Sequence, residues 1–116
     1  MKAFRQYPGQ DKELISSCVF TADSFFLRLS GLILRKPLQD HQSLLITGCK
    51  SIHTVGMRYN IDAVFIDRKS DIVAVFEDIA PWRSTPYIWK AHAVLESKSG
   101  FIKKMKLGLG DRIIFE

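Results

Sequence analysis

Cys49 and His53 have the clearest potential for covalent chemistry in this sequence, because they stand four positions apart between two glycines. At this separation an imidazole can approach a thiol, lower its pKa and make it a nucleophile. Such a dyad also needs a group that orients the imidazole, and Asp62 is the nearest carboxylate. The structural alternative, a buried cysteine beside a loop histidine that bonds to backbone groups, is the more common role for these residue types.

The same three residue types also occur in zinc sites, so a metal centre has to be weighed. Structural zinc sites use ligand pairs at short, regular spacing, such as Cys-x-x-Cys or His-x-x-x-His. The sequence contains neither pair, and its two cysteines, Cys18 and Cys49, are too few for a disulfide scaffold. We therefore expect two reduced thiols, no bound metal and no cofactor.

A tryptophan and an arginine, Trp82 and Arg83, follow Pro81 in a connection rich in aromatic residues. A flat apolar ring beside a planar guanidinium is common where a protein holds a ligand or a partner, and it is also a common way to cover a small core. Glu96 follows an apolar run and is a candidate counter-ion for Arg83 or Arg58.

Asp62 also has a structural interpretation. It opens an apolar segment shortly after Arg58, so its carboxylate is expected to pair with that guanidinium or to accept hydrogen bonds from loop amides. If either holds, its loss should destabilise the fold.

The loops at residues 49–58 and 81–89 carry most of the side chains that folding alone does not explain. We expect these loops to lie side by side and to form opposite walls of a cleft over a sheet. A binding module for a small molecule or peptide is favoured over a hydrolase or transferase that uses Cys49, His53 and Asp62, because the distinctive residues are of mixed type. The expected ligand-binding residues are Ser51, His53, Met57, Arg58, Trp82, Arg83 and Glu96.

Short β-type runs alternate with turn residues along the chain. The runs at residues 61–67 and 72–79 flank a polar cluster and predict a β-hairpin. The other predicted elements are strands at 14–20, 44–47, 91–95 and 112–115, a helix at 22–34 and a short helical turn at 101–105. Short strands joined by turns predict a mostly β fold, namely a small antiparallel β-barrel or sandwich with one or two short helices.

Two motifs occupy the centre of the sequence, CKSIHTVGMR at residues 49–58 and IDAVFID at residues 61–67. Further matches are Gly31-Leu32, Pro81-Trp82-Arg83, Leu95-Glu96 with Gly100, and Gly110-Asp111. Through these motifs, residues 14–116 resemble domain-of-unknown-function family 192, also called uncharacterised protein family 0127. The resemblance implies a compact, mainly β fold and brings no agreed activity.

The composition predicts a single globular domain over residues 1–116, with residues 1–13 as a polar lead-in. The net charge of +5 is scattered, and its densest stretch, at residues 98–106, lacks the interleaved aromatics of a single-strand binder, so nucleic-acid binding is disfavoured. No run approaches the ~20 apolar residues of a membrane span, and no signal-peptide pattern begins the chain. We expect a cytoplasmic protein, and no feature of the sequence specifies an oligomeric state.

Overall fold

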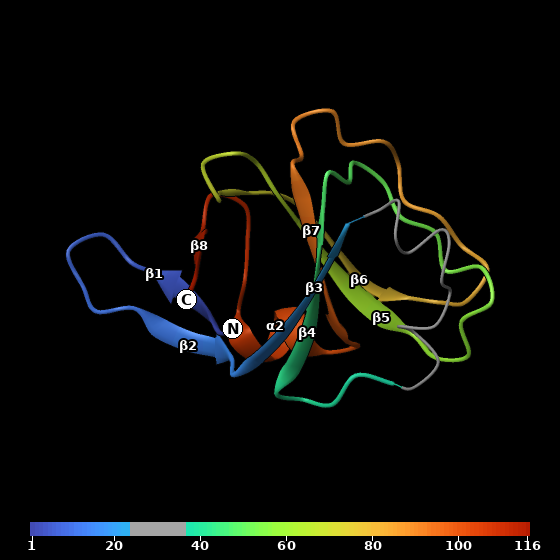
Figure 1. Cartoon of the computed structure of the whole chain (residues 1–116), viewed down its shortest axis with the longest axis horizontal. Helices are drawn as coiled ribbons and strands as arrows, with labels where there is room; N and C mark the ends of the chain where they lie inside the picture. Colours follow the sequence, from blue (N-terminus) through green and yellow to red (C-terminus); the bar gives the residue numbers. More distant parts are fainter. Residues whose placement is uncertain (24–36) are drawn as a thin grey trace.

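The computed structural model describes residues 1–23 and 37–116. In these residues the chain forms eight β-strands and one short helix, which confirms the prediction of a mostly β fold (Figure 1). The strands form two sheets, one of three strands and one of five, and neither sheet closes into a barrel.

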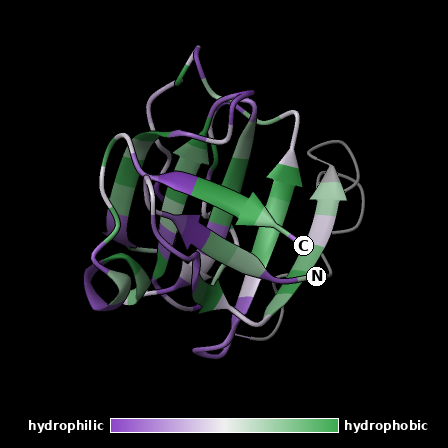
Figure 2. Cartoon of the chain, turned by 90° about the vertical axis from the view of Figure 1, so that its left-hand side faces the viewer, coloured by the Kyte–Doolittle hydropathy of each residue, from purple (hydrophilic) through white to green (hydrophobic). Residues whose placement is uncertain are grey.

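The smaller sheet contains the strands β1 (Ala3–Gln6), β2 (Glu13–Ser16) and β8 (Arg112–Phe115) in the order β2-β1-β8. Both of its pairings are antiparallel, and Figure 2 shows this sheet from its outer side. Residues 1–13, expected to be a polar lead-in, contribute β1, which is the central strand of this sheet. Its buried residues, Ala3 and Arg5, alternate with two half-buried neighbours, a pattern too short to stand out in the sequence.

The larger sheet has the strand order β3-β4-β7-β5-β6. Its strands are β3 (Cys18–Asp23), β4 (Gln42–Thr47), β5 (Ile61–Ile66), β6 (Ile72–Ile79) and β7 (Ala93–Lys98). Three of its four pairings are antiparallel, whereas β3 and β4 are parallel. The strand predicted at residues 14–20 is divided at Ser17 between β2 and β3, which belong to different sheets.

The predicted hairpin at residues 61–79 is confirmed by the antiparallel pairing of β5 and β6. The carboxylate of Asp67 closes the turn, because its Oδ1 accepts hydrogen bonds from the amides of Lys69 (2.9 Å) and Asp71 (3.0 Å). A short-range side chain to backbone contact of this kind is typical of aspartate in turns, which is why the sequence located the hairpin well.

The helix predicted at residues 22–34 lies outside the described residues except for its first two positions, which continue β3. The helical turn predicted at residues 101–105 is confirmed as α2 (Phe101–Met105). This helix buries Phe101 and Ile102 and ends at Lys106, which adopts a left-handed conformation (φ 54°). In residues 1–23 and 37–116, no helix has the length and apolar character needed to cross a membrane.

Two hydrophobic cores lie on opposite faces of the larger sheet, and β5 contributes to both. Side chains alternate along a strand. Val64 and Ile66 therefore belong to the core between the two sheets, which we call the inner core, while Ala63 and Phe65 belong to the core on the opposite face, which we call the outer core. The inner core also contains Ala3, Ile15, Phe101, Ile102, Leu107 and Ile113, and the outer core also contains Leu44, Ile46, Cys49, Ile52, Met57 and Val94. All six residues of β5 are therefore buried, which explains why five of the six are apolar.

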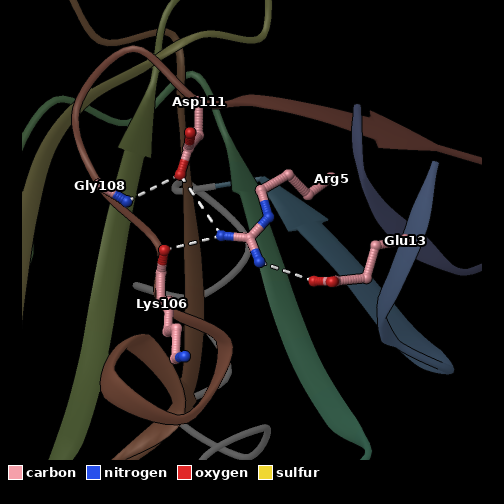
Figure 3. Close-up of polar contacts among 5 residues, drawn as sticks. All are labelled: Arg5, Glu13, Lys106, Gly108 and Asp111. Atoms are coloured by element: carbon pink, nitrogen blue, oxygen red, sulfur yellow. Dashed lines mark hydrogen bonds and ion pairs between the residues drawn. The ribbon is translucent and has the colours of Figure 1, made fainter. Parts of the chain in front are cut away.

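Arg5 connects the smaller sheet to the turn that follows α2 (Figure 3). The residue is only 5% exposed. Its Nη1 donates a hydrogen bond to the carbonyl of Lys106 (2.7 Å) and lies 3.5 Å from Oδ2 of Asp111, while Nη2 donates to Oε1 of Glu13 (2.7 Å). Oδ2 of Asp111 also accepts a hydrogen bond from the amide of Gly108 (2.9 Å). One buried guanidinium thus joins β1 to β2 and to the turn at residues 106–111, which is remote in sequence.

Candidate functional site

The loops at residues 48–60 and 80–92 run antiparallel to each other and are joined through their backbones; we call them the paired loops. Their backbone hydrogen bonds include Thr54 N to Arg83 O (2.8 Å), Trp82 N to Thr54 O (3.0 Å), Thr85 N to Ile52 O (2.9 Å) and Ile88 N to Lys50 O (2.7 Å). His53 and Ser84 also form an isolated antiparallel bridge. The prediction that these loops lie side by side is confirmed.

Two buried threonines join the paired loops through their side chains. The hydroxyl of Thr54 donates to the carbonyl of Ala80 (2.7 Å) and accepts a hydrogen bond from the amide of Arg83 (2.8 Å). The hydroxyl of Thr85 accepts from the amide of Ile52 (3.0 Å). Neither threonine is among the predicted site residues, because a threonine in a loop carries no distinctive sequence signal.

The paired loops do not form opposite walls of a cleft along their bonded residues, because their backbones contact each other directly. The main-chain groups that would face a ligand in such a cleft instead form hydrogen bonds from one loop to the other. Side chains alternate instead, so Ile52 and Thr54 are buried while Ser51, His53 and Val55 are exposed. A ligand of the paired loops would therefore contact their outer surface.

The structure does not bring Cys49, His53 and Asp62 together as a catalytic triad. Cys49 is 6% exposed in the outer core, and its Sγ donates to the carbonyl of Ser51 (3.0 Å). His53 is exposed, and its Nδ1 accepts from the amide of Val55 (3.4 Å). A buried thiol with this geometry does not support a hydrolase or transferase built on Cys49. The described ranges also contain no group of three His, Cys, Asp or Glu side chains that could hold a metal ion.

Asp62 is fully buried and serves the fold. Its Oδ1 accepts a hydrogen bond from the amide of Asp78 (2.8 Å), and its Oδ2 accepts one from the amide of Ile102 (2.9 Å), in the first turn of α2. Its carboxylate thus connects β5 to β6 and to α2. The expectation that it bonds to amides is correct, but they belong to β6 and α2 and not to the preceding loop, and Arg58 is exposed.

Asp62→Ala is expected to lower the free energy of unfolding by roughly 1 to 3 kcal/mol, because it leaves a buried amide, that of Ile102, and a partly buried one, that of Asp78, without their acceptor. Asp78 depends on this contact most, since its backbone has a positive φ of 52°. Thermal denaturation tests this, with Glu77→Ala as the control because Glu77 is an exposed carboxylate on β6. Equal midpoints for the two variants would contradict a structural role for Asp62.

The predicted ligand-binding residues fall into two groups. Five of them are exposed on the paired loops, namely Ser51, His53, Arg58, Trp82 and Arg83. The other two are buried: Met57 (6% exposed) packs in the outer core, and Glu96 (2% exposed) lies on β7. The seven predicted ligand-binding residues therefore do not share one surface.

Four large apolar side chains on the paired loops are strongly exposed. Trp82, Tyr87 and Trp89 are 69%, 68% and 70% exposed, and Val55 is 54% exposed. Trp82 also has a φ of 63°, in the left-handed region. We refer to these four residues and the exposed Arg83 as the aromatic loop surface.

Glu96 does not pair with Arg58 or Arg83 as expected, because both arginines are exposed whereas its carboxyl group is buried. Its Oε2 has no hydrogen-bond partner in the described structure. Burial raises the pKa of this carboxyl group to about 7. The pKa of Tyr59 is also raised, first by burial and then by the negative charge of Glu96, so the phenol lies near the carboxyl group.

Comparison with known proteins identifies relatives over most of the chain. A family model described as Uncharacterized ACR, DUF192, matches residues 9–115. A UPF0127 protein of Pyrococcus horikoshii is 35% identical over 97 residues, which cover 79% of this chain and 82% of that protein. A UPF0127 protein of Pyrococcus abyssi is 31% identical over 97 residues, covering 79% and 80%.

Two crystal structures share the fold. One is a protein of unknown function from Novosphingobium aromaticivorans, with a TM-score of 0.80 and 14% identity over 99% of this chain and 84% of that chain. The other is a putative transcription regulator from Sinorhizobium meliloti, with a TM-score of 0.77 and 18% identity over 97% of this chain and 91% of that chain. At these identities the likeness supports the architecture alone.

Proposed function

Since the chain belongs to the DUF192 family, whose description specifies no activity, we propose from its own surface that it is a binding module for a small molecule or peptide. The ligand is recognised by the aromatic loop surface. It carries a carboxylate or carbonyl group next to a planar apolar group.

The conformation of Trp82 is the observation that carries this proposal. A left-handed backbone costs a residue with a Cβ roughly 1 to 2 kcal/mol, and glycine would avoid that cost. The indole side chain is 69% exposed, so little burial offsets the strain. Strained residues that folding does not require are concentrated at binding and catalytic sites. The position of Trp82 therefore supports a role in recognition.

The paired loops hold this surface in place before a ligand arrives. Thr54 fixes both sides of Trp82, because its carbonyl accepts from the Trp82 amide and its hydroxyl accepts from the Arg83 amide. Further along, Lys50 Nζ donates to the carbonyls of Trp89 and Ala91, both at 2.7 Å. A backbone that is already ordered lowers the entropy that binding must remove.

Arg83 gives the surface its chemical preference. Its side chain is exposed next to Trp82 and makes no ion pair within the described part of the chain. A guanidinium binds carboxylates through two parallel hydrogen bonds, while aromatic rings contact planar apolar groups. The combination fits a ligand with an acidic or carbonyl group beside a ring.

The proposal is tested with N-acetyl-L-phenylalanine, whose ring and carboxylate match this surface, and with its neutral primary amide. We expect the acid to shift the indole N–H signals of Trp82 and Trp89 in NMR spectra and to bind roughly tenfold more tightly than the amide. A pentapeptide ending in the same residue separates the two ligand sources, because only a peptide-binding surface binds it more tightly than the single amino acid.

Arg83→Ala should weaken binding of the acid while changing the free energy of unfolding by less than ~0.5 kcal/mol. Trp82→Gly should also weaken binding and leave stability unchanged or raise it by up to about 1 kcal/mol, because it relieves the left-handed strain. Arg68→Ala, in the exposed turn of the β5–β6 hairpin, is the matched control. The proposal fails if no probe binds at millimolar concentration, or if Arg83→Ala unfolds as readily as Asp62→Ala.

A further inference from the structure

Glu96 occupies the middle of the larger sheet, in a position where folding favours an apolar residue. It lies on β7 directly between Leu44 of β4 and Ala63 of β5. Strand alternation places its side chain on the same face as Val94, toward the outer core. A carboxyl group at the centre of an apolar face is expensive to bury, and such groups are normally paired.

Among the described residues this carboxyl group has no counter-ion, and one of its two oxygens has no hydrogen bond. Its Oε2 is buried without a hydrogen bond, and none of the ion pairs formed by the described residues includes Glu96. Among the titratable groups on the elements around it, Tyr59 is the neighbour whose pKa it perturbs, whereas Asp62 on β5 points to the inner core and bonds to α2. Tyr59 is itself an acid and supplies no positive charge.

We propose that Glu96 forms a second binding site, on the outer-core face of the larger sheet, which takes the ammonium group of a small primary amine. An ammonium ion supplies both features that the carboxylate lacks, a positive charge and N–H donors. A water molecule would supply a donor but leave the charge uncompensated. The amine must be small, because Glu96 is only 2% exposed. This site is independent of the aromatic loop surface.

The same geometry makes binding dependent on pH. A proton and an ammonium ion compete for the carboxylate, and burial places the pKa of Glu96 at about 7. Below that pH the affinity for the amine should fall roughly tenfold per pH unit, because the charged form of Glu96 becomes the minor form. Above it the affinity should become constant.

The experiment follows the titration of Glu96 by the NMR signal of its carboxyl carbon, with methylammonium chloride as the probe. Saturating methylammonium should lower the pKa of Glu96 by roughly 1 to 3 units, as a positive charge within hydrogen-bond distance does. Tetramethylammonium chloride at the same ionic strength is the control, because it has the charge but no N–H donor, and it should have no effect. Glu77 is an exposed carboxyl group, and its signal in the same spectrum should be the same with and without methylammonium.

The outcomes distinguish this site from ordinary salt effects. The proposal is overturned if methylammonium leaves the pKa of Glu96 unchanged or if tetramethylammonium shifts that pKa equally. It is also overturned if methylammonium changes the carboxyl signal of Glu77 to the same extent. Glu96→Gln keeps the shape of the side chain and should abolish saturable binding of methylammonium. Because the titration of the wild-type protein decides the question alone, the test does not depend on how stable this variant is.

Discussion

Replacing Arg5 with alanine is expected to destabilise the protein by roughly 2 to 3 kcal/mol, as the loss of hydrogen bonds to a charged group does. The guanidinium of Arg5 is buried and contacts the carbonyl of Lys106 and the carboxylates of Glu13 and Asp111. Its removal leaves that carbonyl without its donor and one partly buried carboxylate without its counter-ion. The cost arises from the lost hydrogen bonds and the lost packing of the buried Arg5 side chain, because Glu13 and Asp111 remain partly in contact with solvent.

Chemical denaturation with urea measures this change in free energy. Arg112→Ala is the matched control, because Arg112 lies on the adjacent strand β8 and pairs with Asp71 at the surface. An exposed pair of this kind contributes roughly 0 to 1 kcal/mol, so the control should remain close to the wild type. If Arg5→Ala and Arg112→Ala are equally stable, the network in Figure 3 does not hold the sheet to α2.

Raising the pH from about 5 to about 8 is expected to lower the free energy of unfolding by roughly 2 to 3 kcal/mol through Glu96. Burial raises the pKa of this group from 4.5 to about 7 in the folded protein. Between these values the folded state holds a proton that the unfolded state has released, so the stability decreases with rising pH. The contribution is complete below the unfolded pKa and is lost as the pH passes the folded pKa.

Glu96→Gln should make the stability nearly constant over this pH range and raise it at about pH 8 by a similar amount. The carboxylates of Asp71 and Asp78 do not interfere, because hydrogen bonds from Arg112 and Ser99 hold their pKa values below the ordinary 3.8. Those two groups affect stability only in more acidic solution. Thermal midpoints of both proteins, measured across the pH range, test this prediction. If the midpoint of the wild type changes with pH in the same way as that of Glu96→Gln, the carboxyl group of Glu96 is solvated in the folded protein.

The parts of the fold that the sequence predicted are those fixed by local interactions. The β5–β6 hairpin follows from two apolar runs around a turn that Asp67 closes with its own side chain. Strand β1 was missed because its partners, β2 and β8, include the far end of the chain, and four residues give no measurable periodicity. The parallel pairing of β3 and β4 was equally invisible, since it depends on chain connection and not on residue type.

The candidate site was predicted in its location but not in its organisation. The sequence indicated that two loops would meet and that Trp82 and Arg83 have no obvious role in folding. It could not show that Thr54 joins the loops, because that contact requires residues 80 and 83 to be placed first. Nor could it separate the buried Glu96 from the exposed arginines, since burial is a property of the assembled sheet.

The antiparallel arrangement of β1 and β8 determines how the domain responds to force. Residues 2 and 116 exchange both of their backbone hydrogen bonds, so they lie side by side at one end of the β1–β8 pair. A load applied between these residues acts across the strands, along the direction of the ladder bonds. The bonds then open one after another like a zipper, in contrast to a shear geometry in which all of them resist together. Three residues further along β1, such an opening would reach Arg5 and its polar contacts to Glu13 and Lys106.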